Sequence, residues 1–143
     1  MVHSIPQRNI TCEAAVAAAQ AVIVAARVRG IRVNVAVVDR GGLLCAFLRM
    51  PGAPLHSIDI AIDKAYTAAS FGLATSSWSA VLAEHSPAVR DGLVLRPRFV
   101  AFGGGVPIVE DHELLGAVGV SGGSEMQDEE CAKAGVTAIG IDQ

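Results

Sequence analysis

The elements predicted along the chain come in the order helix, hairpin, helices, hairpin, helix. This order indicates an α+β fold with an antiparallel sheet of about five strands and helices packed on it. Two turns carry the prediction: the sequence Asp-Arg-Gly-Gly at 39–42 joins two apolar runs, and a polar connection at 111–113 joins two more. With 143 residues and no repeat, low-complexity segment or linker, the chain is expected to form one domain, residues 1–143.

The N-terminal third is predicted to supply one helix and the first hairpin. A helix is expected over 11–29, because Thr11 can cap its start and Gly30 can end it. Residues 31–39 are predicted to form an interior strand, since apolar side chains alternate onto both of its faces. The partner strand of this hairpin is expected over 43–50.

Helices are predicted for the middle of the chain. The sequence Pro-Gly-Ala-Pro at 51–54 breaks the sheet, and a helix is expected over roughly 56–71, closed by a glycine. Two short helices are expected at about 76–85 and 86–92, the second with proline at its permitted first position. Connecting chain then leads to the second hairpin.

The second hairpin contains two glycine clusters. One strand is predicted from Phe99 through the triple glycine at 103–105 to Val109, and its partner is expected over 114–121. A double glycine at 122–123 follows the partner strand. Glycines at these places indicate that the backbone closely approaches either another piece of chain or a ligand.

The last helix has a well-marked start. Ser124 is a suitable N-cap, and Gln127, three residues later, completes a capping box. The helix is expected to end near Gly135, which leaves 136–141 as an extended tail.

Several segments together resemble the GlcG/HbpS family, often labelled the heme-degrading domain family. The resemblance rests on GGGVPI, GAVGVSGGS and CAKAG, and on the earlier VAVVDRGG and GAPLHSIDIAIDKAYTAASF in the same order, so that it covers nearly the whole chain. It implies a profilin-like α-β-α sandwich. It also implies a range of functions: some members bind or handle heme, one relative is a domain fused to a corrinoid-modifying enzyme, and many lie in catabolic operons without an assigned reaction.

The composition limits the partners of the chain. Hydrophobic residues make up 52% and charged residues only 17%, with a mean hydropathy of +0.47. Because the surface of a small monomer carries more charge, a homo-oligomer is expected. A net charge of −3 without any basic cluster argues against nucleic acid as a partner.

The cysteines and the N-terminal region favour a cytoplasmic protein. Cys12, Cys45 and Cys131 lie far apart and are interpreted as small buried apolar residues, not as a disulfide framework or a zinc site. The apolar stretch 14–26 resembles part of a signal peptide, but polar residues recur in it every seven positions, as in a helix of a folded domain. It is also too short to cross a membrane, so no membrane partner is expected.

Two glycine motifs are poor matches to known catalytic loops. Residues 119–123 fit the pattern G-x-S-x-G, but no histidine follows Ser121 to complete a hydrolase triad. The triple glycine at 103–105 lacks the Lys-Ser/Thr of a phosphate loop. Close packing or approach to a ligand explains both motifs better.

Of the four histidines, His56 is the strongest candidate for function. His3 lies in the tail, His85 ends a short helix and His112 lies at a hairpin tip. His56 starts a helix close to a strand end, so it is predicted to act as an axial ligand to heme iron or as a general base, although a purely structural role fits as well. The metal prediction applies only if heme is bound.

Lys64 is the second candidate catalytic residue. It lies on the same helical face as His56, two turns further on, with Ser57 adjacent to the histidine. A lysine in this apolar helix can pair with a propionate, a carboxylate or an enolate, and the family resemblance implies a lysine here. The alternative is an ordinary salt bridge to Asp59, to Asp63 or to an acid of another subunit.

The remaining predicted ligand-binding residues are cations and turn residues. Arg49 and Arg98 can each hold a carboxylate through two hydrogen bonds, or can be surface residues. The turns contribute Gly103, Gly104, Gly105, Ser121, Gly122, Gly123 and Ser124. The family often has aspartate where this chain has Pro51, which puts in doubt any reaction that uses that carboxylate.

Three functions remain open from the sequence. The first is a protein that binds or handles heme or a similar tetrapyrrole. The second is a small enzyme without a cofactor, such as an isomerase or tautomerase that moves a proton on a small carboxylate in a catabolic pathway. The third is an accessory subunit whose glycines only permit assembly. Whether the chain is an enzyme is left undecided.

Overall fold

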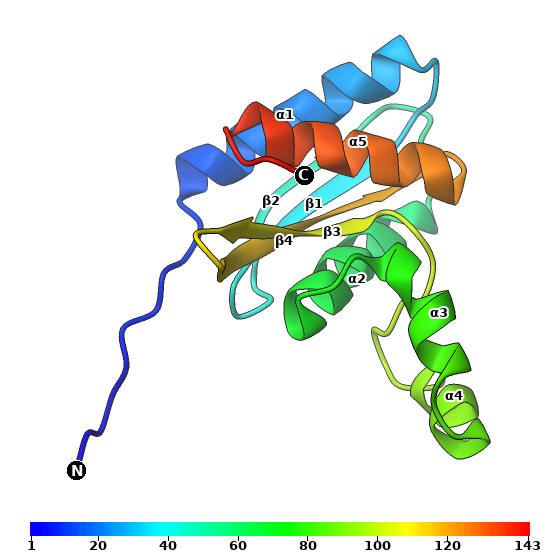
Figure 1. Cartoon of the computed structure of the whole chain (residues 1–143). Helices are drawn as coiled ribbons and strands as arrows, with labels where there is room; N and C mark the ends of the chain where they lie inside the picture. The colour runs from blue at the N-terminus through cyan, green and yellow to red at the C-terminus, as the bar shows by residue number, and fades with distance from the viewer.

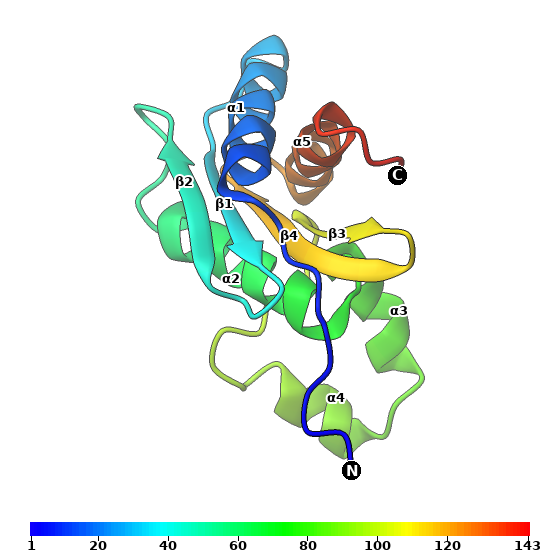
Figure 2. The same ribbon diagram turned by 90° about the vertical axis from the view of Figure 1, so that its left-hand side faces the viewer.

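The computed structural model describes residues 1–143 as an α+β sandwich of three layers (Figure 1). A four-stranded antiparallel sheet has the order β2-β1-β4-β3. Helices α1 and α5 cover one face of this sheet and α2 covers the other, as Figure 2 shows from a second direction. The elements in chain order are α1 (Cys12–Val28), β1 (Asn34–Asp39), β2 (Leu44–Arg49), α2 (Ser57–Phe71), a 3-10 turn (Thr75–Ser77), α3 (Trp78–Ala83), α4 (Pro87–Leu93), β3 (Gly105–Glu110), β4 (Glu113–Ser121) and α5 (Glu125–Ala138).

The two faces of the sheet bury different kinds of side chain. Between the sheet and helices α1 and α5 lies a core rich in valine. The core under α2 is built mostly of alanines, so the helix lies very close to the sheet. Gly119 of β4 permits this approach, because a side-chain carbon at this position would collide with the backbone of Ala61 and Ala65.

Helices α3 and α4 extend away from the sandwich below α2 (Figure 1). Helix α4 has no buried residue, whereas α3 is attached through Trp78, whose ring packs edge-on against Phe71 and Phe99. No helix of the chain is both long enough and apolar enough to cross a membrane.

The predicted fold class and most helix boundaries are confirmed. Thr11 caps α1, Gly72 closes α2 with a positive φ of 65°, and β1 is buried on both faces. The capping box of Ser124 and Gln127 at the start of α5 is also present.

The sheet has four strands, not about five, and the strand predicted over 99–109 is shorter than expected because residues 99–104 are not part of it. This segment crosses α2 instead, where Thr67 Oγ1 donates to the carbonyl of Arg98 and accepts from the amide of Val100. Strand β3 therefore begins only at Gly105.

The predicted end of the last helix is also wrong, since α5 continues past Gly135 to Ala138. A side-chain carbon at Gly135 would lie 2.7 Å from Val22 Cγ2 and 2.9 Å from the carbonyl of Ala18. This glycine therefore serves close packing of α5 on α1 and not helix termination.

The expectation of buried cysteines holds only for Cys131. Cys12 is the first residue of α1 and Cys45 lies on the edge strand β2, and both side chains are exposed because no further element covers those positions.

Candidate functional site

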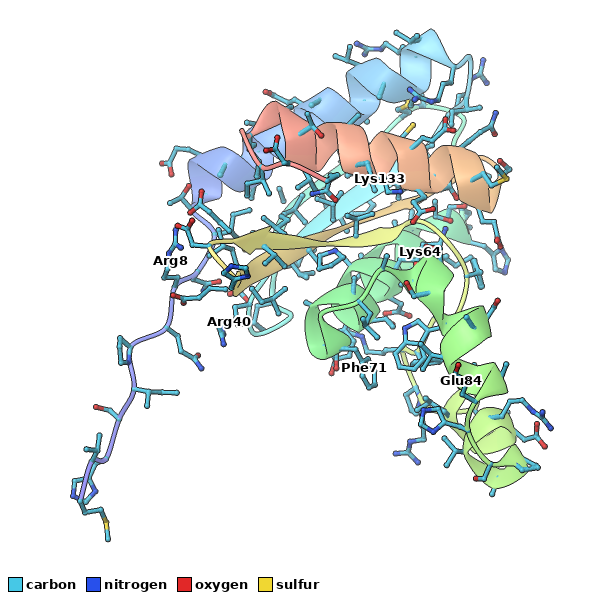
Figure 3. The ribbon with its side chains drawn as sticks, in the orientation of Figure 1. Arg8, Arg40, Lys64, Phe71, Glu84 and Lys133 are labelled. Atoms are coloured by element: carbon cyan, nitrogen blue, oxygen red, sulfur yellow. The ribbon has the colours of Figure 1, made fainter.

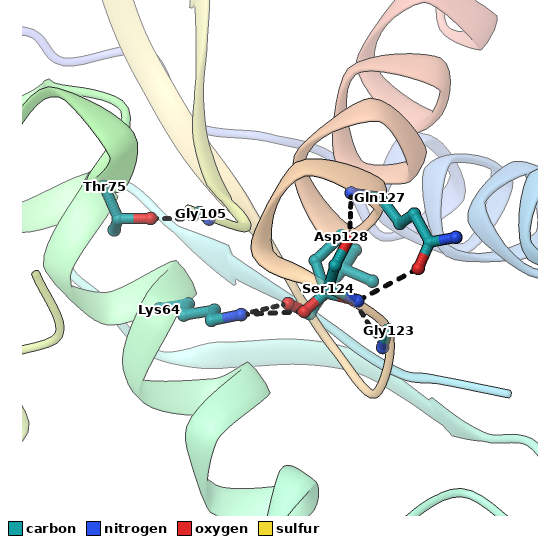
Figure 4. Close-up of polar contacts among 8 residues, drawn as sticks. Lys64, Thr75, Gly105, Gly123, Ser124, Gln127 and Asp128 are labelled. Carbon is teal, nitrogen blue, oxygen red and sulfur yellow. Dashed lines mark hydrogen bonds and ion pairs between the residues drawn. The ribbon is translucent and has the colours of Figure 1, made fainter. Parts of the chain in front are cut away.

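Lys64 and Asp128 form a buried ion pair between α2 and α5 (Figure 4). Lys64 Nζ lies 3.0 Å from Asp128 Oδ2 and also donates to the carbonyl of Val120 at 2.9 Å. The other carboxylate oxygen accepts from the amide of Gly123 at 2.8 Å. The partner of Lys64 is therefore an acid of the last helix of the same chain, and not Asp59, Asp63 or an acid of another subunit.

The amine of Lys64 contacts protein atoms almost exclusively. Only 1% of its side chain is exposed, and the ring of Phe102 lies 5.1 Å from the nitrogen. Burial lowers the pKa of Lys64 below its usual 10.5, and the neighbouring charge of Asp128 opposes this shift. Because Lys64 belongs to α2 and Asp128 to α5, the pair links the two helical layers that lie on either side of the sheet.

The predicted glycine turns surround this pair. A side-chain carbon at Gly104 would lie 2.5 Å from the carbonyl oxygen of Val120 and 2.6 Å from Lys64 Nζ. Thr75 Oγ1 accepts from the amide of Gly105 at 2.8 Å, and Gly103 lies against the carbonyl of Glu125. Other parts of the chain thus contact the triple glycine closely.

The turn at Gly122 and Gly123 is also in close contact with other parts of the chain. Gly122 lies against the backbone of Arg32, and Gly123 lies against the side chain of Gln127. Ser121 is 5% exposed, and Ser124 uses its hydroxyl to accept from the amide of Gln127. The structure therefore brings both glycine clusters, Ser121 and Ser124 together around Lys64 and Asp128.

His56 lies apart from this buried cluster. It directly precedes α2, its side chain is exposed, and it makes no capping hydrogen bond. Lys64 is eight positions further along the chain, which is about 12 Å along a helix axis. His56 lines an open cavity of about 350 Å³ with Leu55, Ile58 and Asp59, while its neighbour Ser57 is buried.

Arg49 and Arg98 line different cavities. Arg49, at the end of β2, donates to the carbonyl of Ala53 at 2.7 Å. Arg98 donates to Asp63 at 3.0 Å, and its guanidinium lies 3.6 Å from the centre of the Tyr66 ring. The structure does not bring the two arginines together, so they cannot hold one carboxylate between them.

Two features escaped the sequence analysis. Asp128 lies in the first turn of α5, and its spacing from Lys64 carries no signal because the two residues are 64 positions apart. One cavity is lined by Arg27, Arg32 and Arg49, and these three arginines come from three separate segments of chain. No sequence pattern joins such residues, and only the folded topology places them together.

The sequence of the chain is similar to those of several known proteins. The family model described as haem degrading protein HbpS-like matches residues 10–137. An uncharacterised 15.0 kDa protein of Citrobacter freundii is 38% identical over 84% of both chains. The corrinoid adenosyltransferase PduO of Salmonella typhimurium is 36% identical over 76% of this chain, which spans only 32% of that protein.

Solved structures agree with the family match. A double mutant of Streptomyces reticuli HbpS superposes with a TM-score of 0.86 at 36% identity, covering 96% of this chain and 91% of that one. The PduOC:heme complex superposes with a TM-score of 0.85 at 31% identity, covering 94% of this chain and 99% of that one.

Proposed function

This chain belongs to the HbpS-like family, and on this basis we propose that it binds heme, or a related tetrapyrrole, as a heme-handling protein. The observation that carries the proposal is the exposed imidazole of His56 in an open cavity that it shares with Leu55, Ile58 and Asp59. The heme complex of the PduOC relative supports it.

The residues around His56 fit an axial ligand site. The imidazole is exposed and is not used in helix capping, so a ring nitrogen is available to iron. Leu55, 76% exposed, and the partly buried Ile58 offer apolar contact to the face of a macrocycle. The open cavity would hold part of the ring and leave the rest at the surface. Heme, when bound, would supply the iron centre and its redox chemistry.

A second candidate function is proton transfer on a small carboxylate without a cofactor. The lowered pKa of Lys64 favours it, because lowering the pKa of an amine makes its unprotonated, basic form more accessible. The burial of Lys64 opposes it, since a substrate would have to displace Phe102 or the glycine turns to reach the nitrogen.

A hemin titration read by absorbance tests the proposal. The unmodified protein, His56→Ala and His112→Ala are compared, the last as a control because His112 is an exposed histidine at a hairpin tip. We expect a saturable, stoichiometric Soret shift in the unmodified protein and in His112→Ala, and its loss in His56→Ala.

Two other outcomes of the hemin titration would overturn the proposal or part of it. A weak, non-saturating change in all three proteins would overturn heme binding and leave the proton-transfer enzyme or an accessory subunit. Saturable binding that His56→Ala does not alter would retain heme as the ligand and overturn His56 as its axial residue.

A further inference from the structure

Arginines that have no carboxylate partner are concentrated at one place on the surface. The chain has 11 lysines and arginines, and six of them form ion pairs: Arg8, Arg29, Lys64, Arg90, Arg98 and Lys133. Of the five that have no carboxylate partner, Arg27, Arg32 and Arg49 line a single cavity. In a chain with a net charge of −3, this placement is notable because no aspartate or glutamate lines that cavity.

The cavity lies where three segments meet. Arg27 comes from the last turn of α1, Arg32 from the link to β1, and Arg49 from the end of β2. It has a volume of about 340 Å³, and the rest of its lining is Ile23, Leu48, Met50 and Pro51. It therefore combines positive charge with apolar contact surface.

The loop that follows β2 contacts two of the three arginines and holds one of them by a hydrogen bond. Gly52 has a φ of 88°, and a side-chain carbon there would lie 2.6 Å from Arg32 Nη1, so the guanidinium of Arg32 lies directly against this glycine. Arg49 Nη2 donates to the carbonyl of Ala53 in the same loop. Ordering the long side chain of Arg49 before a ligand arrives reduces the entropy lost on binding.

We propose that this cavity binds a small dianion with an apolar body. Guanidinium groups bind carboxylates and phosphates through paired hydrogen bonds. Three like charges around one cavity repel one another, and a ligand with two negative charges relieves this repulsion while its apolar part contacts Ile23, Leu48 and Met50. The site is distinct from the His56 cavity, with which it shares no lining residue, so the inference goes beyond the proposed function.

Calorimetric titration at low ionic strength tests the inference. The probes are adipate, a dicarboxylate, and phenyl phosphate, each beside a monoanion of similar size, hexanoate or benzoate. We expect saturable binding of at least one dianion, at least tenfold tighter than its monoanion. Which dianion binds identifies the acidic group as carboxylate or phosphate.

Substitutions locate the binding. Arg27→Gln and Arg32→Gln are each expected to weaken dianion binding at least tenfold, because each removes a charged fork without disturbing a buried contact. Arg96→Gln serves as the matched control, since Arg96 is also exposed and has no ion pair but lines another cavity. His56→Ala is expected to bind the dianion as the unmodified protein does.

Two results would overturn the site. One is the failure of both dianions to saturate the protein. The other is a loss in Arg96→Gln as large as in Arg27→Gln, which would indicate attraction by overall charge. Neither result bears on the hemin titration, so the two proposals fail independently.

Discussion

Lys64 and Arg49 are both cations predicted from the sequence to be functional, but their surroundings in the structure are opposite. Lys64 is buried, paired with Asp128 and surrounded by chain, so that a ligand would have to displace chain to reach its amine. Arg49 is exposed and lies beside two further arginines without carboxylate partners. The buried cluster is therefore expected to determine stability, and the exposed cavities, including that of His56, are expected to determine binding. Figure 3 shows Lys64 between α2 and the sheet, away from the exposed side chains of the periphery.

The largest effect on stability is expected for Asp128→Ala. This change leaves the ammonium of Lys64 buried without its counterion and removes the acceptor of the Gly123 amide. Breaking a buried pair in this way typically lowers the free energy of unfolding by about 3–5 kcal/mol. Urea unfolding followed by circular dichroism measures the loss.

The double variant Lys64→Met/Asp128→Leu is the control for this prediction. Replacing both ions by apolar side chains leaves no unpaired charge, and such replacements are often neutral or stabilising. A loss of less than about 1 kcal/mol in Asp128→Ala would contradict the buried pair, because exposed ion pairs contribute about that much or less.

The next largest effect is expected for Gly104→Ala. Its φ of 131° is unfavourable for alanine, and the added carbon would press on the carbonyl of Val120 and on Lys64 Nζ. Overpacking of this kind lowers the free energy of unfolding by about 1–3 kcal/mol, and the backbone strain adds to it.

Gly30→Ala separates these two contributions. Gly30 also has a positive φ, 68°, but no atom lies within 4 Å of the position of an added carbon. Its loss of stability in the same urea experiment reports backbone strain alone. Equal losses in the two variants would show that Gly104 is not closely packed on Lys64.

The same contrast explains how far the sequence predicts the fold. Caps and turn residues act locally, so Thr11, Ser124 and Gly72 mark helix ends correctly. Gly135 was misjudged because its role depends on Val22 and Ala18 of another helix. Residues 99–104 were misjudged because an apolar run has strand character until a neighbour, here Thr67, takes its backbone groups.

The candidate site was predictable to a lesser degree. The sequence singled out His56, Lys64, Arg49 and the glycine turns as candidates, but it did not show that they lie in separate places in the fold. Helical spacing places His56 and Lys64 on one face without saying that the first is exposed and the second buried. Asp128, Arg27 and Arg32 depend on contacts between distant segments, for which a single sequence has no signal.

A pH-dependent effect is expected at the buried pair. Because burial lowers the pKa of Lys64 in the folded protein below 10.5, the unfolded chain keeps this proton to a higher pH. Between the two pKa values the unfolded state binds more protons, so the contribution of Lys64 to stability rises with pH. The groups that face the amine are Asp128 and Glu125 of α5.

Urea unfolding of the unmodified protein and of Lys64→Met/Asp128→Leu, from neutral pH towards pH 10, measures this effect. The free energy of unfolding of the unmodified protein is expected to rise relative to that of the double variant, in which the pair is absent and the remaining titrating groups are shared. A relative fall with increasing pH would mean that the folded state raises the pKa of Lys64, and hence that Asp128 outweighs burial.

The smallest effects on stability are expected in the exposed cavities. His56→Ala and Arg27→Gln change side chains that are exposed and make no hydrogen bond or ion pair within the chain, so the free energy of unfolding should change by less than about 0.5 kcal/mol. Hemin binding should nevertheless be lost in the first variant, and dianion binding should weaken in the second. If either variant instead lost several kcal/mol, its binding defect would reflect unfolding, and the division between a buried cluster for stability and exposed cavities for binding would fail.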